Sequence, residues 1–368
     1  MEISPKLWYN GRTLGVLIGE RTWPMPQVIA LGDVNIDIIA HFPFYPAKGE
    51  DALAHSTEIH CGGSAANTAM VLARLGIEVS LIARLGPDSL ALRALHSLSA
   101  AGVISSDLQR DATTMTGLMY VIVTPDGERT ILGHRGANVL TDPAQIREES
   151  FRTAKLFHLS GYALLADPQR SAALLALEMA CRHGLTVTLD PGMAVPLAVL
   201  NEMQALLPVV DILLPSLAEA RHLTGRREPE ECARALLDAG VQAVALKLGR
   251  EGSLIATDDR LFRAPGFGVE VRDSTGAGDS FAAGVIAGFL GGLDWPGMAV
   301  LGNALGAMTA AQVGAGAAAL QARQVLALLT DHQHQPDYGN CLEAIQQAID
   351  LVATLTVEPK EEEKPWWR

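Results

Sequence analysis

Short apolar runs alternate with longer segments of helical periodicity along most of the chain. The runs predict strands over Val28–Ile39, Val79–Ala83, Leu156–Leu159, Thr186–Asp190, Ile212–Pro215 and Ala243–Leu248. The segments between them predict helices over Ala65–Leu75, Ser89–Ala101, Gln169–His183, Leu217–Leu223, Pro229–Ala239 and Asp279–Leu290. Strands that alternate with helices are typical of a parallel sheet covered by helices. The pattern therefore predicts a doubly wound α/β fold.

Two stretches interrupt this alternation, at His41–His60 and Thr116–His134. The second contains VIVTPDGERTIL, in which two apolar runs flank the dipeptide Asp126-Gly127. An Asp-Gly pair between such runs is typical of a tight hairpin turn. We expect these antiparallel pieces, about 41–60 and 116–134, to form a lid.

The two ends of the chain differ from its middle. Residues before Pro26 precede the first clear strand, and the tail VEPKEEEKPWWR is a charge run closed by two Trp. Apolar positions at helical spacing predict a helix over Cys341–Leu355 that packs on the body. We expect a core domain over 27–330, an N-terminal extension over 1–26, and a C-terminal helix and charged tail over 331–368.

The composition is that of a globular protein and narrows the classes of partner. Hydrophobic residues make up 49% of the 368 residues and charged residues 19%, so a large buried core is expected. A formal charge of −13 repels a phosphate backbone and argues against nucleic acid as a partner. The four cysteines form no CxxC pair, and the N-terminus has no secretion signal, so we expect a cytoplasmic protein.

The segment Trp295–Gln321 carries no acidic residue, lysine or arginine and is long enough to span a bilayer. It contains many small residues and lacks the density of large apolar side chains that drives membrane insertion. A helix buried in a soluble core explains it better. We therefore expect no membrane partner.

The strongest chemical signal is DSTGAGDSFAAGVIAGFL, which begins at Asp273. The glycine-rich turn Gly276-Ala277-Gly278 runs straight into an apolar helix, so free backbone amides and the positive end of the helix dipole converge on one spot. That spot suits an anion. A carboxylate beside it, Asp279, could take a proton from a hydroxyl that attacks the anion. The alternative is that Asp279 caps the helix and the glycines only turn the chain.

Three weaker segments accompany this one. CGGSAANTAMVLARLG combines the pair Gly62-Gly63 with Asn67, an amide on a helix of small residues. In LGDVNIDII, period-two alternation puts the polar side chains of residues 33, 35 and 37 on one face of the first strand, where they are costly to bury unless they bind something. LKLGREG ends a strand in a glycine turn beside Lys247. Each could also be an ordinary turn.

Some patterns are set aside. The chain has no GxxxxGK[ST] motif, which excludes a Walker-type ATPase. Residues 314–319 fit G-x-G-x-x-A by letters but follow a helical pattern instead of a strand. His332 and His334 lack the further ligands that a metal site needs.

Taken together and in order, these segments resemble the ribokinase-like, or PfkB, family of carbohydrate and nucleoside kinases. GGSAANTA resembles its N-terminal signature, and DSTGAGDSFAAG its C-terminal signature. RGAN at Arg135–Asn138, DILLPSLAEARHLTG and LKLGREG fall where the family has counterparts. The resemblance covers about Val28 to Leu328. It implies an α/β/α sandwich with a mostly parallel central sheet and a small β-sheet lid.

The resemblance also implies a reaction, transfer of the γ-phosphate of ATP to a primary hydroxyl, with Asp279 as catalytic base. The implied anion hole consists of the backbone amides of Gly276, Ala277 and Gly278. The implied acceptor site consists of Asn35, Asp37, Gly62, Gly63 and Asn67.

The family's cofactors map onto further positions. The nucleotide is expected at Lys247, Gly249 and Gly252, with Asn303 beside the adenine pocket. Glu219 corresponds to the glutamate of the NxxE motif, which supports magnesium through water. Family members are often activated by potassium, which here would involve Asp273 and Thr275.

The chain departs from the family pattern at several places. Ser216 stands where NxxE has asparagine, which leaves the handling of magnesium open. Ser64 replaces the lysine that ribose kinases have after the Gly-Gly pair, and Ser160-Gly161 replaces an expected acidic residue. No arginine of the kind found in acid-sugar kinases follows Asp190. These departures argue against a true ribokinase and against a charged keto acid, and favour a neutral sugar as acceptor.

Two other functions stay open. A nucleoside kinase of the same fold would need a platform for the base near the lid, which Phe42, Phe44 and Tyr45 could supply. A binding protein that has lost catalysis is a rival of another class; Ser216 favours it and the intact Asp279 opposes it. The oligomeric state is also open, with a homodimer as one option.

Overall fold

The computed structural model describes residues 25–126, 129–192, 198–312 and 321–355. In these residues the main sheet has nine strands, in the order β13-β12-β11-β10-β9-β8-β1-β4-β5. They are β1 (Val28–Leu31), β4 (Val79–Leu85), β5 (Leu108–Arg110), β8 (Leu156–Ser160), β9 (Thr186–Asp190), β10 (Ile212–Leu213), β11 (Ala243–Lys247), β12 (Ser253–Ala256) and β13 (Leu261–Ala264). Neighbours from β5 to β11 pair in parallel, and β12 and β13 pair antiparallel at one edge.

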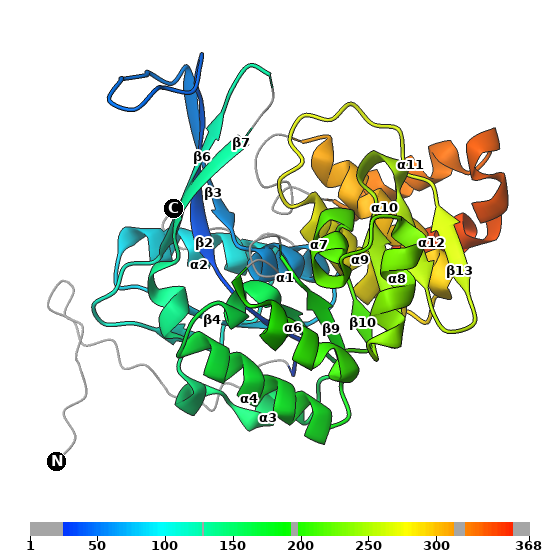
Figure 1. The fold of residues 1–368 in the computed structure, drawn as a ribbon, viewed down its shortest axis with the longest axis horizontal. Coiled ribbons are helices and arrows are strands. Elements are labelled where there is room, and N and C mark those ends of the chain that lie inside the picture. The colour runs from blue at the N-terminus through cyan, green and yellow to red at the C-terminus, as the bar shows by residue number, and fades with distance from the viewer. Residues whose placement is uncertain (1–24, 127–128, 193–197, 313–320, 356–368) are drawn as a thin grey trace, which may run out of the picture.

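Helices cover both faces of this sheet (Figure 1). One face carries α1 (Ser64–Arg74), α2 (Ser89–Ala101), α9 (Ala277–Leu290), α10 (Trp295–Ala310), α11 (Ala322–His332) and α12 (Leu342–Leu355). The other carries α3 (Glu148–Phe151), α4 (Gln169–Arg182), α6 (Leu200–Leu206), α7 (Leu217–Thr224) and α8 (Pro229–Asp238). Within β1, Val28 and Ala30 pack into the first core and Ile29 and Leu31 into the second. This arrangement confirms the predicted α/β fold.

A smaller sheet of four strands stands out from the body (Figure 1). Its order among the described residues is β3-β2-β6-β7, with β2 (Asn35–His41), β3 (Ser56–Gly62), β6 (Gly117–Val123) and β7 (Arg129–His134). The predicted hairpin is therefore correct in its two strands, β6 and β7, which pair antiparallel. Part of its turn, Gly127, lies outside the described residues.

The prediction of one strand over Val28–Ile39 is wrong. The chain leaves the main sheet after β1 and enters the small sheet at β2. A Cβ on Gly32 would lie 2.7 Å from the Cβ atoms of both Ala65, on α1, and Ser160, at the end of β8. The chain therefore leaves the sheet at a point where only glycine fits between these two elements. At Val34 the backbone N–H and C=O bond to the side chain of Asn138, at 2.9 Å each, instead of to a neighbouring strand.

The first part of the segment predicted as a buried, uncharged helix, Trp295–Gln321, forms α10, which ends at Ala310 and packs closely against α9. A Cβ on Gly284 of α9 would lie 2.6 Å from the Cα of Gly302, so the two helix backbones nearly touch. Within the residues that the structure describes, we find no helix with the length and hydrophobicity that a bilayer crossing requires. The GxGxxA pattern at 314–319 lies outside the described residues.

Candidate active site

The predicted site residues gather at the carboxyl ends of the parallel strands, the edge where α/β proteins of this type bind their ligands. β9 ends at Asp190 and β11 at Lys247. The Nζ of Lys247 lies 2.6 Å from Oδ2 of Asp190. Burial lowers the pKa of Lys247, but the charges of Asp190 and Glu219 outweigh this effect, so the pKa lies above its ordinary value. A charged lysine is therefore held at this edge.

The glycine-rich turn leads into α9 as predicted, although the helix begins at Ala277, two residues before the predicted start. Gly276 is its N-cap and has a φ of 76°, which favours glycine. No side chain caps this N-terminus. The amide of Ala277 donates to the carbonyl of Ser274 at 3.2 Å, so Gly276 and Gly278 are the better anion donors of the predicted three. Two of the three predicted amides are therefore placed to meet an anion at this helix start.

Asp279 lies in the first turn of α9 and is not its cap, which contradicts the alternative reading. Its Oδ2 accepts a hydrogen bond of 2.8 Å from Nδ2 of Asn67, on α1. Burial raises the pKa of Asp279 to about 6, and the charge of Asp190 acts in the same direction against the hydrogen bonds of Asn67 and Ser64. A carboxylate with such a pKa can hold or accept a proton near neutrality.

Among the residues predicted for the acceptor site, Asp37 on β2 carries a buried carboxylate that the chain itself satisfies only in part. It is buried, and its Oδ1 has no hydrogen-bond partner among the described residues. Burial raises the pKa of Asp37 to about 7, and the charges of Asp279 and Asp273 add to this effect. A Cβ on Gly62 would lie 2.1 Å from Oδ2 of Asp37, so only glycine leaves room for this carboxylate.

The second glycine of the pair sets the start of α1. Gly63 is the N-cap of this helix and has a φ of 101°. A Cβ there would lie 2.3 Å from the carbonyl oxygen of Asp33. The GG pair therefore makes room for Asp37 and lets α1, which carries Asn67, begin directly beside the lid.

The three polar residues 33, 35 and 37 do not share one face of a strand, because the strand predicted for them is two strands. Asp33 is paired with Arg135, at 2.7 and 2.8 Å, and also accepts a 2.8 Å bond from Gln169. Asn35 accepts a 2.9 Å bond from Nδ2 of Asn138. Asp33 therefore serves the structure, whereas Asn35 and Asp37 stand on β2 next to the site.

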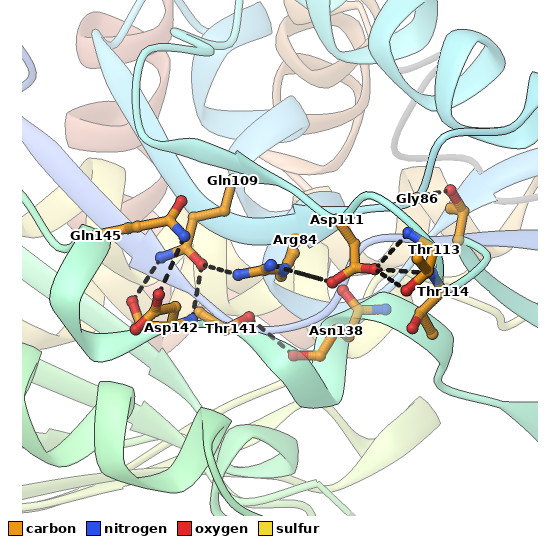
Figure 2. Close-up of polar contacts among 11 residues, drawn as sticks. Arg84, Gly86, Gln109, Asp111, Thr113, Thr114, Asn138, Thr141, Asp142 and Gln145 are labelled. Carbon is orange, nitrogen blue, oxygen red and sulfur yellow. Dashed lines mark hydrogen bonds and ion pairs between the residues drawn. The ribbon is translucent and has the colours of Figure 1, made fainter.

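Figure 2 shows a polar network that reaches Asn138 through Thr141. The hydroxyl of Thr141 donates to the carbonyl of Asn138 at 2.8 Å. The side-chain amide of Gln109, on β5, donates to the backbone carbonyl of Asp142 at 2.9 Å and accepts from the backbone amide of Asp142 at 2.7 Å. Arg84 of β4 contacts the side chain of Gln109 at 3.4 Å. The sheet edge thus fixes the segment after the lid, and Asn138 fixes the point where β2 begins.

Glu219 is buried near the amino end of α7, and Ser216 is the N-cap of that helix. The Ser216 amide donates to Oε2 of Glu219 at 2.7 Å, and the Glu219 amide donates to the Ser216 hydroxyl at 3.3 Å. These two bonds form a capping box. Its signature, S-x-x-E, is present in the sequence, although no capping box was predicted here. Burial raises the pKa of Glu219. Glu219 is thus a buried residue and not one on the exposed surface of the helix.

A cavity of about 550 Å³ adjoins the anion site, a size that suits a nucleotide. Gly249 and Gly252 line it as predicted, together with Lys247, Gly278 and Asn303. The amide of Asn303 does not point free into it, because Nδ2 donates to the carbonyls of residues 264 and 265 at 3.2 and 3.0 Å. Asn303 therefore shapes the wall of the cavity.

The two residues predicted for potassium contact a cation of the chain itself. Arg129, the first residue of β7, lies 2.8 Å from Oδ1 of Asp273 and 2.8 Å from the hydroxyl of Ser274, and it also bonds the hydroxyl of Thr275. The amide of Thr275 donates to Asp273 at 2.9 Å. The lid is thereby joined to the loop that precedes the anion site.

Three residues of this region were not expected from the sequence to contact the site: Asp190, Arg129 and Asn138. Arg129 lies in the predicted hairpin and Asn138 in the RGAN segment, but neither residue was assigned a role from the sequence. The described residues contain no cluster of three or more His, Cys, Asp or Glu side chains placed to hold a metal, and His332 and His334 belong to none.

Comparison with known proteins agrees with this geometry. The family model "pfkB family carbohydrate kinase" matches residues 25–323. The chain is 33% identical over 291 residues to the ATP-dependent ribose-1-phosphate kinase of Halopiger xanaduensis, covering 79% of this chain and 94% of that protein. It is 28% identical to the ribokinase of Haemophilus influenzae, covering 71% and 84%.

A solved structure supports the same assignment. The ribokinase of Arabidopsis thaliana, complexed with ribose and ATP, superimposes with a TM-score of 0.72 at 25% identity, covering 82% of this chain and 98% of that one. The lid, the Gly-Gly pair, the anion site and Asp279 thus occur in a chain that matches the family over most of its length. This protein belongs to the PfkB family of carbohydrate kinases.

Proposed function

We propose that the protein transfers the γ-phosphate of ATP to a primary hydroxyl of a neutral sugar. The observation that carries this proposal is the position of Asp279. It lies in the first turn of α9, next to uncapped backbone amides, and Asn67 holds its carboxylate. A base is thereby placed beside a site for an anion, as a phosphoryl transfer requires.

The oxygen of the sugar hydroxyl bonds to the γ-phosphorus while Asp279 accepts the proton of that hydroxyl. The bond from the γ-phosphorus to the bridging oxygen of the β-phosphate breaks, and ADP leaves. The raised pKa of Asp279 matches it to this task near neutral pH. The amides of Gly276 and Gly278 and the ammonium group of Lys247 favour the negative charge of the transferring group. A Cβ on Gly278 would lie 3.5 Å from Nζ of Lys247, so the two are neighbours.

The charges of the site support a neutral acceptor. Arg129, Arg135 and Lys247 each form an ion pair with an aspartate of the chain, so their charges are already balanced. The unpartnered Oδ1 of Asp37 suits a sugar hydroxyl and would repel a phosphate. A sugar phosphate, the substrate named for the Halopiger relative, is the rival acceptor within the family.

A nucleoside is the other rival. Phe44 and Tyr45 are 49% and 52% exposed on the lid, so they are free of core packing but do not by themselves distinguish a base from solvent. The intact Asp279 opposes the loss of catalysis that a purely regulatory role requires.

We also propose magnesium as the companion of ATP, with Glu219 as the carboxylate that holds it through water. The buried Glu219 lies within the field of Lys247 and Asp190 at the same edge of the sheet. Its capping bond to Ser216 fixes the side chain, which suits a residue that orders a hydrated ion. Bound magnesium would neutralise phosphate charge during transfer.

A cytoplasmic location and a homodimer remain further proposals. The four cysteines are free thiols, which supports a reducing compartment.

An ADP-release screen over neutral sugars, ribose 1-phosphate and nucleosides tests the proposed reaction. We expect a neutral sugar to give the highest kcat/KM. Asp279→Asn should lower turnover about 10²- to 10⁴-fold with little change in ATP affinity, because the amide cannot take the proton. Wild-type turnover in this variant would contradict the mechanism, and a preference for ribose 1-phosphate would replace the neutral acceptor.

Asp37→Asn should raise the KM of the acceptor about 10- to 100-fold, through loss of a charge-assisted hydrogen bond, while the KM of ATP changes little. Because the pKa of Asp37 is raised from 3.8 to about 7, this carboxyl lowers the stability of the fold progressively as the pH rises between these two values, and fully above pH 7. The variant should therefore melt at a higher temperature than wild type at pH 8. This difference should shrink as the pH falls from 7 toward 4; a constant difference would argue against a raised pKa.

Glu219→Gln should reduce activity at low free magnesium and recover in part as magnesium is raised, because the residue acts through the position of the ion. Asp279→Asn, the matched control, should not recover. Superimposable magnesium titrations of wild type and Glu219→Gln would leave Glu219 with its capping role alone.

Asp273 and Thr275 already bind a cation, the guanidinium of Arg129, so the donor set fits potassium once that arginine is displaced. We expect potassium to raise the turnover of Arg129→Met more than that of wild type, measured against sodium and a bulky organic cation at constant ionic strength. Potassium should also raise the melting temperature of this variant selectively. Equal effects of all three cations on turnover and melting temperature in both proteins would contradict a potassium site.

A further inference from the structure

The wall of the nucleotide cavity includes a loop, residues 264–268, that follows β13. Gly266, Phe267 and Gly268 of this loop line the cavity. A Cβ on Gly266 would lie 2.4 Å from the carbonyl oxygen of Arg250, so the loop lies directly against the glycine turn at residues 249–252. A shift of this loop would therefore change both sides of the nucleotide site.

Two side chains hold the loop, and they come from different parts of the chain. Asn303 of α10 binds the carbonyls of residues 264 and 265. Tyr338 donates its hydroxyl to the next carbonyl, that of Gly266, at 2.7 Å. Tyr338 belongs to a short 3-10 helix, Pro336–Cys341, between α11 and α12. It lies beyond residue 323, where the family match ends.

Aromatic packing adds to this hydrogen bond. The rings of Phe267 and Tyr338 are stacked, with centroids 5.2 Å apart and planes 18° apart. The ring of His332 meets both edge-on, at 5.3 and 5.4 Å. Nδ1 of His332 lies 2.9 Å from the carbonyl oxygen of Leu328, so this ring is fixed by its own helix. Offset and edge-to-face contacts of this kind favour one ring arrangement over others.

The segment that carries Tyr338 is itself firmly attached. Side chains of α11 and α12 are fully buried in the same core as α9 and α10, among them Val325, Leu329, Ile345 and Val352. Tyr338 is only 4% exposed. The C-terminal segment is therefore anchored in the core of the protein, and it holds Tyr338 against the loop at residues 264–268.

We propose that Tyr338 is a positioning residue for the nucleotide, acting through Phe267 and the carbonyl of Gly266. The 3-10 helix Pro336–Cys341, through this one side chain, then affects the affinity for ATP without touching the nucleotide. The inference depends on the proposed function only in taking ATP as the occupant of this cavity.

Direct binding of ATP, measured by calorimetry without acceptor, tests the inference in the full chain. Tyr338→Phe keeps the stack and removes the hydrogen bond, so the Kd of ATP should rise about 3- to 10-fold. Tyr338→Leu removes both contacts and should raise it further. In turnover assays, both should raise the KM of ATP and leave the KM of the acceptor unchanged.

Two matched controls separate positioning from general stability. Tyr120→Phe changes an exposed tyrosine of the lid and should leave ATP binding unchanged. Ile345→Val weakens the packing of α12, leaves the hydrogen bond from the Tyr338 hydroxyl to Gly266 in place, and should lower the melting temperature alone. An unchanged Kd in Tyr338→Phe would overturn the inference, as would equal rises for Tyr338→Phe and Ile345→Val. If wild type binds no ATP, the proposed function fails instead.

Discussion

The repulsion among carboxylates at one end of the sheet is the constraint on which the rest of the site depends. Asp37, Asp190, Glu219, Asp273 and Asp279 all lie in this region, and burial together with their mutual repulsion raises the pKa values of three of them. Such a cluster destabilises a fold unless cations or hydrogen-bond donors compensate it. Lys247 and Arg129 provide the cations, and Asn67 and the amide of Ser216 provide donors.

This compensation is uneven, and the unevenness has a chemical meaning. Asp190 and Asp273 are each paired with a cation, whereas Asp37 and Asp279 have no cation within bonding distance among the described contacts. Under the proposed function, the two groups that exchange a proton or a hydrogen bond with the acceptor, Asp279 and Asp37, are thus among those with raised pKa values. The paired ones keep the site assembled.

Much of the fold and the centre of the site could be predicted because they depend on local patterns. Strands such as β9 and helices such as α2 follow from periodicity, and the turn at Gly276 follows from the need for an unusual φ beside a helix start. The break between β1 and β2 could not be seen, since the residues on either side read as one apolar strand. It results from a long-range contact of Val34 with Asn138.

The remaining misses are also contacts between distant segments. Arg129 and Asp273 are 144 positions apart, as the difference of their numbers shows, and Tyr338 and Gly266 are 72 apart. Nothing local to an arginine in a hairpin or a tyrosine after a helix indicates its partner. The capping box at Ser216 is different, because its signature S-x-x-E is local and can be read directly from the sequence.

The short link between β1 and β2 makes the lid and the acceptor site one mechanical unit. Asp37 belongs to a strand of the lid sheet, so any movement of that sheet away from the body would carry its carboxylate away from Asp279. Under the proposed function, an acceptor that contacts both carboxylates would close the site by its own binding energy. A water molecule has a single oxygen and cannot contact both groups in this way, so the same arrangement would protect ATP from hydrolysis until a sugar binds.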